Sequence, residues 1–191
     1  MGIAEILRLR PAGETRAASS LYGLVLAQAR DRRFFSALGV PDTLDGRFET
    51  LALHAFLLLH RLKLESWEGA AGLARAVIEA FVADMDRTLR EMGAADLGVG
   101  RRVKEMTQAL YGRIRAYEEG LDRSGDGALE AALRRNLYGT LDMPRLADLT
   151  AVARYVRRQH VALAAQPISE LRAGRVGFAP LSDPEGPEAQ P

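Results

Sequence analysis

The sequence predicts an all-α protein: a single-domain bundle of about six helices, followed by a proline-rich tail with a disordered end. Apolar residues recur with helical periodicity almost from end to end, and no stretch alternates with period two for long. The 191 residues are 48% hydrophobic and 27% charged, which is the composition of a globular domain long enough to bury a core. These two observations fix the expected fold class.

Start and stop signals delimit the first three helices. The first ends at Gly39, and the second follows the capping candidates Asp42 and Asp45. The third has Ser66 as its expected N-cap and Gly93 as its stop. The six expected helices cover residues 16–38, 45–64, 67–92, 99–119, 127–138 and 144–165.

The later helices and the chain ends follow the same rules. Asp96 precedes the fourth helix, the turn "RSGDG" precedes the fifth, and Pro144 fits the first turn of the sixth. Residues 1–15 form an N-terminal arm in which "IAEILRLR" has the pattern of a short amphipathic helix. Residues 166–191 hold five of the eight prolines and are expected to be an irregular tail.

The expected helix 45–64 is apolar on nearly every side. Such a helix is either central to a bundle or forms the floor of a groove, and both positions stay open here. Its candidates for lining a client groove are Phe48, Leu53, Phe56 and Leu57. In helix 144–165 the apolar stripe runs from Leu146 to Leu163.

Composition excludes several classes of function. Cysteine is absent, so there are no disulfides, thiolate metal sites or cysteine nucleophiles. The net charge of +1 argues against a dedicated DNA-binding protein. No run reaches the roughly 20 apolar residues of a membrane helix, and the N-terminus lacks the pattern of a secretion signal. We therefore expect a cytoplasmic protein.

Two candidate ligand motifs fail on spacing. Gly98-Val99-Gly100 lacks the third glycine of a dinucleotide loop and follows a helix, so it is expected to be an interhelical hinge. His54 and His60 are six residues apart and cannot share one helix face, while His160 falls on an apolar stripe. The sequence predicts no metal, no cofactor and no catalytic group, and hence no enzyme.

The polar and charged residues at or beside the apolar helix faces indicate interaction surfaces. Asp86 and Arg90 pair along their own helix, whereas Asp84 borders the apolar stripe without an obvious local partner. Gln28 and Arg32 project into the apolar stripe of the first helix. Either Gln28 bridges buried helix ends, or that face opens onto a cleft.

Helix 99–119 carries a basic face opposite its core stripe. Arg101, Lys104 and Arg115 lie there beside Tyr111, and Arg113 follows close by. An aromatic side chain among cations suits an acidic partner, a lipid headgroup or RNA; the alternative is a solvated face.

Two segments together resemble the ubiquinol–cytochrome c chaperone family. They are "LYGLVLAQARDRRFFSALGVPDTLDGRFETLALHAFLLLHRL" and "FVADMDRTLREMGAADLGVGRRVKEMTQALYGR". The second carries the distinctive pattern D-M-D-x-x-LRE-x-G, V-G-x-x-VK-x-M and YGR. The positions matching the family pattern are Gln28, Arg30, Pro41, Asp42, Gly46, Arg47, Phe48, Asp84, Asp86, Arg90, Glu91, Asp96, Gly100, Lys104, Tyr111 and Arg113.

This resemblance implies a non-enzymatic helical chaperone that assists cytochrome b during assembly of the respiratory bc1 complex. Mitochondrial members of the family work with a small partner subunit at the ribosome exit, on a nascent membrane protein. A bacterial member would bind newly made cytochrome b, or another hydrophobic client, in the cytoplasm or at the inner face of the cytoplasmic membrane. Two alternatives stay open: an RNA- or ribosome-binding module that uses the basic face, and a carrier of lipid or another small molecule.

Overall fold

The computed structural model describes residues 12–93 and 96–181, and all regular secondary structure in them is helical. Each of the six expected helices has a counterpart, and two short helices, α3 and α9, are additional. The helices are α2 (Ala12–Ala29), α3 (Arg33–Ser36), α4 (Leu44–Lys63), α5 (Ala70–Glu91), α6 (Asp96–Asp122), α7 (Gly127–Arg135), α8 (Leu146–Ala164) and α9 (Ile168–Arg172). The all-α prediction is confirmed.

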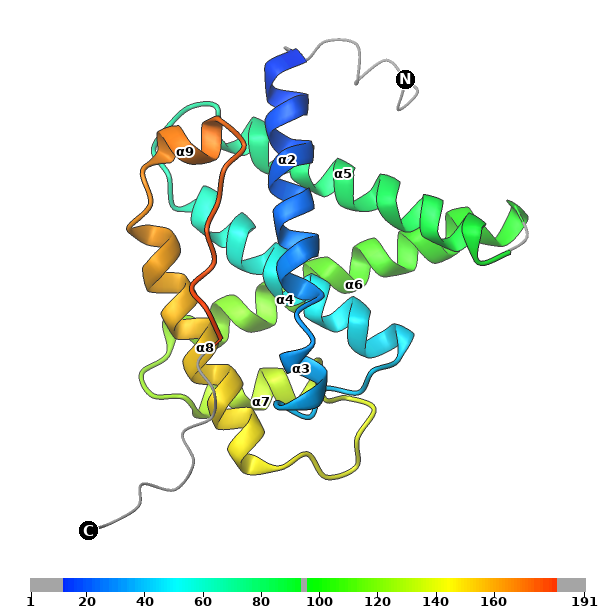
Figure 1. Cartoon of the computed structure of the whole chain (residues 1–191), viewed down its shortest axis with the longest axis vertical. Helices are drawn as coiled ribbons and strands as arrows, with labels where there is room; N and C mark the ends of the chain where they lie inside the picture. The colour runs from blue at the N-terminus through cyan, green and yellow to red at the C-terminus, as the bar shows by residue number, and fades with distance from the viewer. Residues whose placement is uncertain (1–11, 94–95, 182–191) are drawn as a thin grey trace.

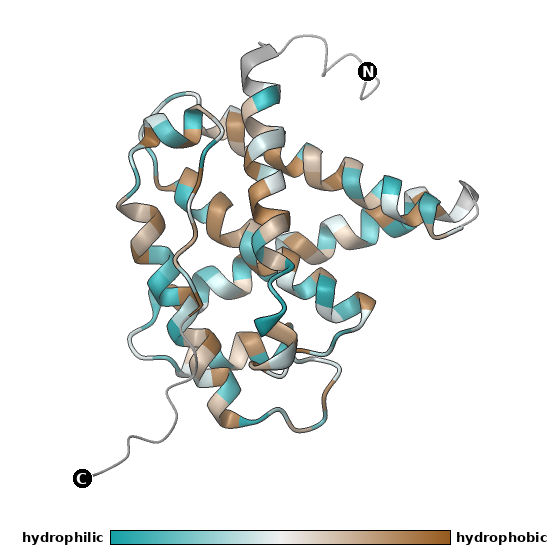
Figure 2. Cartoon of the chain, in the orientation of Figure 1, coloured by the Kyte–Doolittle hydropathy of each residue, from teal (hydrophilic) through white to brown (hydrophobic). Residues whose placement is uncertain are grey.

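Helix α4 lies at the centre of the fold. It packs against α2, α5, α6 and α8, and residues 49–62 are all buried (Figure 1). Apolar positions concentrate where these helices cross, as the hydropathy colouring shows (Figure 2). A helix that is apolar on every side needs cover on every side. Of the two positions that the sequence left open, α4 has the central one.

Helices α5 and α6 form a hairpin that projects to one side of the bundle (Figure 1). Helix α5 begins at Ala70 with Gly69 as its N-cap, rather than directly after Ser66. Gly93 ends it with φ of +80°, which favours glycine because it has no Cβ. The expected hinge at Gly98 and Gly100 is wrong, since both residues lie inside α6 and the turn precedes them.

The expected helix 16–38 is broken in two at residues 30–32. The N–H groups of Arg30 and Asp31 bond to carbonyls only three residues back, at 3.3 and 3.1 Å, so the helix tightens and stops. The Asp31 carboxylate then accepts a hydrogen bond from the backbone N–H of Arg33 at 3.0 Å, where α3 begins. Helical periodicity continues across this break, and for that reason the pattern gave no sign of it.

The expected irregular tail begins with α9 and then packs onto the bundle. Leu171, Val176 and Leu181 are buried. The Gln159 amide on α8 donates to the carbonyl of Ala179 at 2.6 Å and accepts from its N–H at 2.8 Å. Gln166 binds Gly177 in the same two-way manner, at 2.7 and 2.8 Å. Residues 182–191 lie outside the described residues, as do residues 1–11 of the expected N-terminal arm.

A chain of buried polar groups joins α2, α4 and α8. The Nδ1 atom of His54 lies 2.7 Å from the carbonyl oxygen of Thr50, and its Nε2 atom lies 2.8 Å from the Tyr155 hydroxyl. Gln28 donates to that hydroxyl at 3.2 Å. The Phe178 ring covers His54, with ring centroids 5.6 Å apart. Burial lowers the pKa of His54 to about 4, so the imidazole is neutral at physiological pH.

None of the described helices is both long enough and apolar enough to span a bilayer. Within residues 12–93 and 96–181, no three His, Asp or Glu side chains are grouped as metal ligands would be.

Candidate functional site

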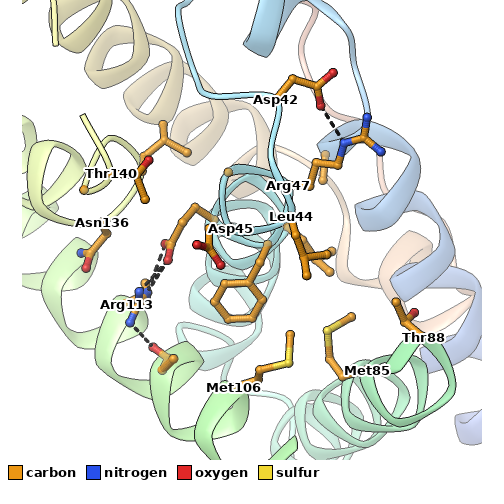
Figure 3. A pocket seen from close by; sticks show the side chains of 18 of the residues that line it. Asp42, Leu44, Asp45, Arg47, Met85, Thr88, Met106, Arg113, Asn136 and Thr140 are labelled. Carbon is orange, nitrogen blue, oxygen red and sulfur yellow. Dashed lines mark hydrogen bonds and ion pairs between the residues drawn. The ribbon is translucent and has the colours of Figure 1, made fainter. Parts of the chain in front are cut away.

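An open groove of about 1090 Å³ lies beside the N-terminal half of α4 (Figure 3). Its walls come from the end of α2, the C-terminal half of α5, the first half of α6 and residues 135–140 after α7. The sequence positions of these walls are far apart, so the groove exists only once the bundle has folded.

The floor of the groove is apolar and rich in methionine. Met85 on α5 and Met106 on α6 point toward it, below the N-terminal end of α4 (Figure 3). Methionine has three rotatable bonds and a polarizable sulfur, so it adapts to differently shaped apolar partners. The apolar lining residues are Leu26, Phe35, Leu44, Phe48, Leu51, Met85, Leu89, Met92, Met106 and Leu137.

The turn before α4 fixes one edge of the groove. The Thr43 hydroxyl, and neither Asp42 nor Asp45, caps α4 by accepting from the N–H of Gly46 at 3.1 Å. A Cβ at Gly46 would lie 1.9 Å from the carbonyl oxygen of Pro41, so only glycine fits this approach. Arg47 then donates from Nε to Asp42 at 2.7 Å across the turn.

An ion pair between α4 and α6 forms one wall. Nη2 of Arg113 lies 2.5 Å from Oε1 of Glu49, and the Arg113 guanidinium sits 5.9 Å from the centroid of the Phe48 ring. Burial raises the pKa of Glu49, and Arg113 partly opposes that rise. The pair ties the two helices together while leaving the Phe48 ring on the groove.

Asp84 borders the groove but is already engaged. Its Oδ2 atom accepts from the Tyr22 hydroxyl at 2.7 Å, and its Oδ1 atom pairs with Arg87. The first contact joins α2 to α5. Burial and this carboxylate raise the pKa of the Tyr22 hydroxyl far above its usual value. Asp84 therefore holds the wall in place, and its oxygens are not free for a ligand.

Four arginines on the groove have no ion-pair partner among the described residues. They come from three different segments, and all four are exposed. They are Arg30, Arg32, Arg102 and Arg135. The groove thus combines an apolar floor with an unneutralised positive rim.

Four of the partner- and client-binding candidates line this groove: Phe48, Arg32, Asp84 and Arg113. The family-pattern positions Arg30, Asp42, Gly46 and Arg47 line it as well. The other three client-groove candidates do not. Leu53, Phe56 and Leu57 are at most 1% exposed and belong to the core, because α2, α5, α6 and α8 cover that half of α4. Their hydrophobicity reflects a central position rather than a binding floor.

The remaining candidates lie elsewhere. Gln28 bridges α2 to Tyr155, which is the first of its two predicted roles. Asp86 and Arg90 pair at 2.7 Å on the surface of α5, as predicted from their spacing. Arg101, Lys104, Tyr111 and Arg115 are exposed along α6, away from the groove. Arg113 is separate from them because it turns inward to Glu49.

Several groove residues were missed by the sequence reasoning. Met85, Leu89 and Met92 follow helical spacing on α5, and that spacing was assigned to the core. Arg102 was not among the candidates on the basic face of helix 99–119, although it lines the groove. Arg135 and Thr140 sit where α7 ends, and no pattern in the sequence distinguishes them.

Comparisons with known proteins agree on one family. The model of the family described as "Ubiquinol-cytochrome C chaperone" matches residues 36–178. "Ubiquinol-cytochrome-c reductase complex assembly factor 1" of Xenopus laevis is 32% identical over 146 residues, covering 75% of this chain and 70% of the frog protein. "Protein CBP3, mitochondrial" of Saccharomyces cerevisiae is 26% identical over 149 residues, or 77% of this chain but only 44% of the yeast protein.

The fold is also that of a solved structure. The crystal structure of the Cbp3 homolog from Brucella abortus superimposes with a TM-score of 0.78 at 33% sequence identity. The alignment covers 94% of this chain and 98% of the Brucella chain. Thus nearly the whole arrangement, including the elements that build the groove, has a counterpart in a bacterial protein.

Proposed function

Because this chain belongs to the ubiquinol–cytochrome c chaperone family, we propose that it is a non-enzymatic assembly chaperone that holds an apolar segment of newly made cytochrome b. The groove beside α4 is the proposed binding site. The observation that carries the proposal is the methionine-lined floor, open to solvent, in a chain of this family.

The physical need for such a site is simple. A membrane segment that has left the ribosome but not yet assembled exposes apolar surface to water. A groove with an adaptable apolar floor covers part of that surface, and a polar rim keeps the empty chaperone from aggregating. Helix-in-groove recognition of this kind needs no cofactor and no chemical step.

Site-specific crosslinking in cells tests the site. A photoreactive residue at Met106 on the groove floor should capture cytochrome b, while the same residue at Val161 should not. Val161 is the matched control because it is exposed on α8 and does not line the groove. Equal capture from both positions, or from neither, would contradict the proposed site.

Gene deletion tests the function independently. Loss of this protein should lower both membrane haem b and bc1 activity, and wild-type levels of both would sink the proposal. Re-expression of the full chain supplies the control.

The proposed location is the cytoplasm, with peripheral contact at the inner face of the membrane. The connection from α7 to α8 carries Leu141 and Met143, and α8 begins at Leu146; these residues are 40%, 87% and 70% exposed. Leu146 was expected in the core, but it stands at the first turn of α8, where no helix covers it. Arg134 lies nearby in the chain and suits anionic headgroups.

A second candidate function, ribosome or RNA binding, rests on the exposed side of α6. Tyr111 is 53% exposed there, with Lys104 and Arg115 also at the surface. Binding driven by phosphates should weaken steeply as salt rises, so ribosome pelleting at several salt concentrations separates this candidate from groove binding. The small partner subunit of mitochondrial relatives stays a prediction for this chain.

A further inference from the structure

The charges on the groove do not balance. Six arginines and five carboxylates line it, and most of the carboxylates are already engaged. Asp42 pairs with Arg47, Glu49 with Arg113, Asp84 with Arg87 and Glu105 with Arg101. Among the lining carboxylates described, that leaves Asp45 without an ion pair.

The lining arginines without a partner number four, against that one carboxylate. Arg30, Arg32, Arg102 and Arg135 approach the groove from the α2 end, the start of α6 and the end of α7. Arg30 and Arg32 share one connection, whereas Arg102 and Arg135 come from two other helices. An apolar occupant alone would leave all four guanidinium groups without a counter-charge beside a partly desolvated surface.

We propose that the groove is selective for apolar polypeptide segments that carry acidic side chains at their flanks. A guanidinium binds a carboxylate through two parallel hydrogen bonds, so an Asp or Glu beside the apolar stretch matches the rim. A segment flanked by Lys or Arg would meet like charge. This inference rests on the proposed function and adds to it the chemistry that decides which segment is held.

The polar, uncharged part of the rim favours a polypeptide over a phospholipid. Thr88, Asn136 and Thr140 surround the floor in Figure 3, and each carries a short hydrogen-bonding side chain. Such groups match the amides and small polar side chains of a peptide.

Such selectivity would be useful to a chaperone of membrane proteins. Cytoplasmic loops next to membrane helices are enriched in Lys and Arg, so segments flanked by acidic residues are the minority. A positive rim would therefore bind most membrane segments weakly and would bind tightly only the few that have acidic flanks. The apolar floor alone cannot make this distinction, because one apolar helix resembles another.

Two synthetic peptides test the inference. They share one apolar helical stretch of about twelve residues, long enough for about three turns, and differ only in Glu-Glu or Lys-Lys flanks. Fluorescence anisotropy with the full chain should give a Kd about tenfold lower for the acidic peptide at low salt. The difference should shrink as salt screens the charges.

Charge-reversal variants locate the effect. Arg32→Glu combined with Arg135→Glu should abolish or invert the preference, while Arg154→Glu should leave it unchanged. Arg154 is exposed on α8, does not line the groove and supplies the matched control. All three side chains are exposed, so thermal unfolding should confirm that the variants fold as the wild type does.

Several outcomes would overturn the inference. Equal affinity for both peptides, unaffected by the arginine variants, would remove the charge selectivity but leave an apolar groove and the proposed function intact. Failure of both peptides to bind would remove both. Displacement of the acidic peptide by anionic phosphatidylglycerol vesicles, dependent on Arg32 and Arg135, would show that the rim recognises lipid phosphate instead.

Discussion

The two halves of α4 both have apolar surroundings, but one half lies in a closed core and the other borders an open groove. From Leu53 to Leu62 the helix is covered by four neighbouring helices, and its apolar side chains there are buried, the largest being leucines and Phe56. At Phe48 and Leu51 the helix instead borders an open groove whose floor is built from methionines of other helices. One half specifies the fold, and the other is left for a partner.

This difference shows where a binding surface comes from in a bundle. The extra apolar surface of the central helix is covered by the neighbouring helices, so it does not create a groove. The groove arises where neighbouring helices diverge, here where α5 and α6 leave the bundle as a hairpin (Figure 1). If so, substitutions on the two halves should have separable effects on stability and on binding.

The largest effect is expected in the sealed half. Leu57→Ala should lower the free energy of unfolding by about 2–5 kcal/mol, because it leaves a cavity that the packed core cannot close. Chemical denaturation measures this, with Leu57→Met as a control that keeps the volume and costs less than about 1.5 kcal/mol. A loss below about 1 kcal/mol for Leu57→Ala would mean that this half is not a closed core.

Acid should destabilise the sealed half through His54. Its pKa is about 4 in the fold, against 6.5 for an exposed imidazole, so the unfolded chain takes up the proton first. The contribution of His54 to the free energy of unfolding is therefore fully present above pH 6.5. It is lost as the pH falls toward 4, which lowers the free energy of unfolding by about 3 kcal/mol.

Unfolding measured between pH 7 and pH 4 checks this expectation in wild type and in His54→Gln, which has no proton to gain. The variant should show a shallower pH dependence. Some slope should remain, because burial also lowers the pKa of His160. An unchanged slope in His54→Gln would assign the acid sensitivity to other groups.

The groove half of α4 is sensitive at Gly46, in the first turn of the helix. Gly46→Ala should cost about 1–3 kcal/mol, because the new methyl group would displace the Pro41 carbonyl and the turn that edges the groove. Affinity for an apolar peptide should fall as well. The control is Gly112→Ala on α6, where a new Cβ would have no neighbouring atom within 4 Å outside its own helix backbone. This control should raise the free energy of unfolding by about 0.5–1 kcal/mol.

The smallest effect on stability is expected on the groove floor. Met106→Ser should change the free energy of unfolding by about 1 kcal/mol or less, since the side chain is only partly buried. It should nevertheless weaken the capture of an apolar peptide several-fold. Equal losses of stability from Met106→Ser and Leu57→Ala would erase the distinction between the two halves.

Sequence periodicity was sufficient for the long helices and insufficient for the site. The expected helix 45–64 differs from α4 by only one residue at each end. The prediction is this close because the capping turn and the apolar residues indicate the same helix. The break after Ala29 was missed because it depends on a local carboxylate contact that does not interrupt the pattern. The packing of residues 174–181 was missed because their partners are two glutamines far back in the chain.

The groove was harder to predict because it depends on where helices separate. Phe48 was the one client-groove candidate that lines the groove, whereas Arg113 was singled out with the basic face. The ion pair from Arg113 to Glu49 explains why this basic residue of α6 faces inward. Met85 and Met106 have the spacing of core residues, and only the angle of the α5–α6 hairpin exposes them to the groove. Amphipathic spacing identifies a buried face but not how tightly that face is closed.

The two-way glutamine contacts on α8 also bear on the order in which the molecule is completed during translation. Synthesis proceeds from the N-terminus, so α4 leaves the ribosome well before Phe178, which covers His54. Until Gly177 and Ala179 are synthesised, the amides of Gln166 and Gln159 lack their backbone partners, and the His54 imidazole stays open to water. A protein that we propose guards unfinished chains would thus itself remain incompletely packed until residues 177–179 are made.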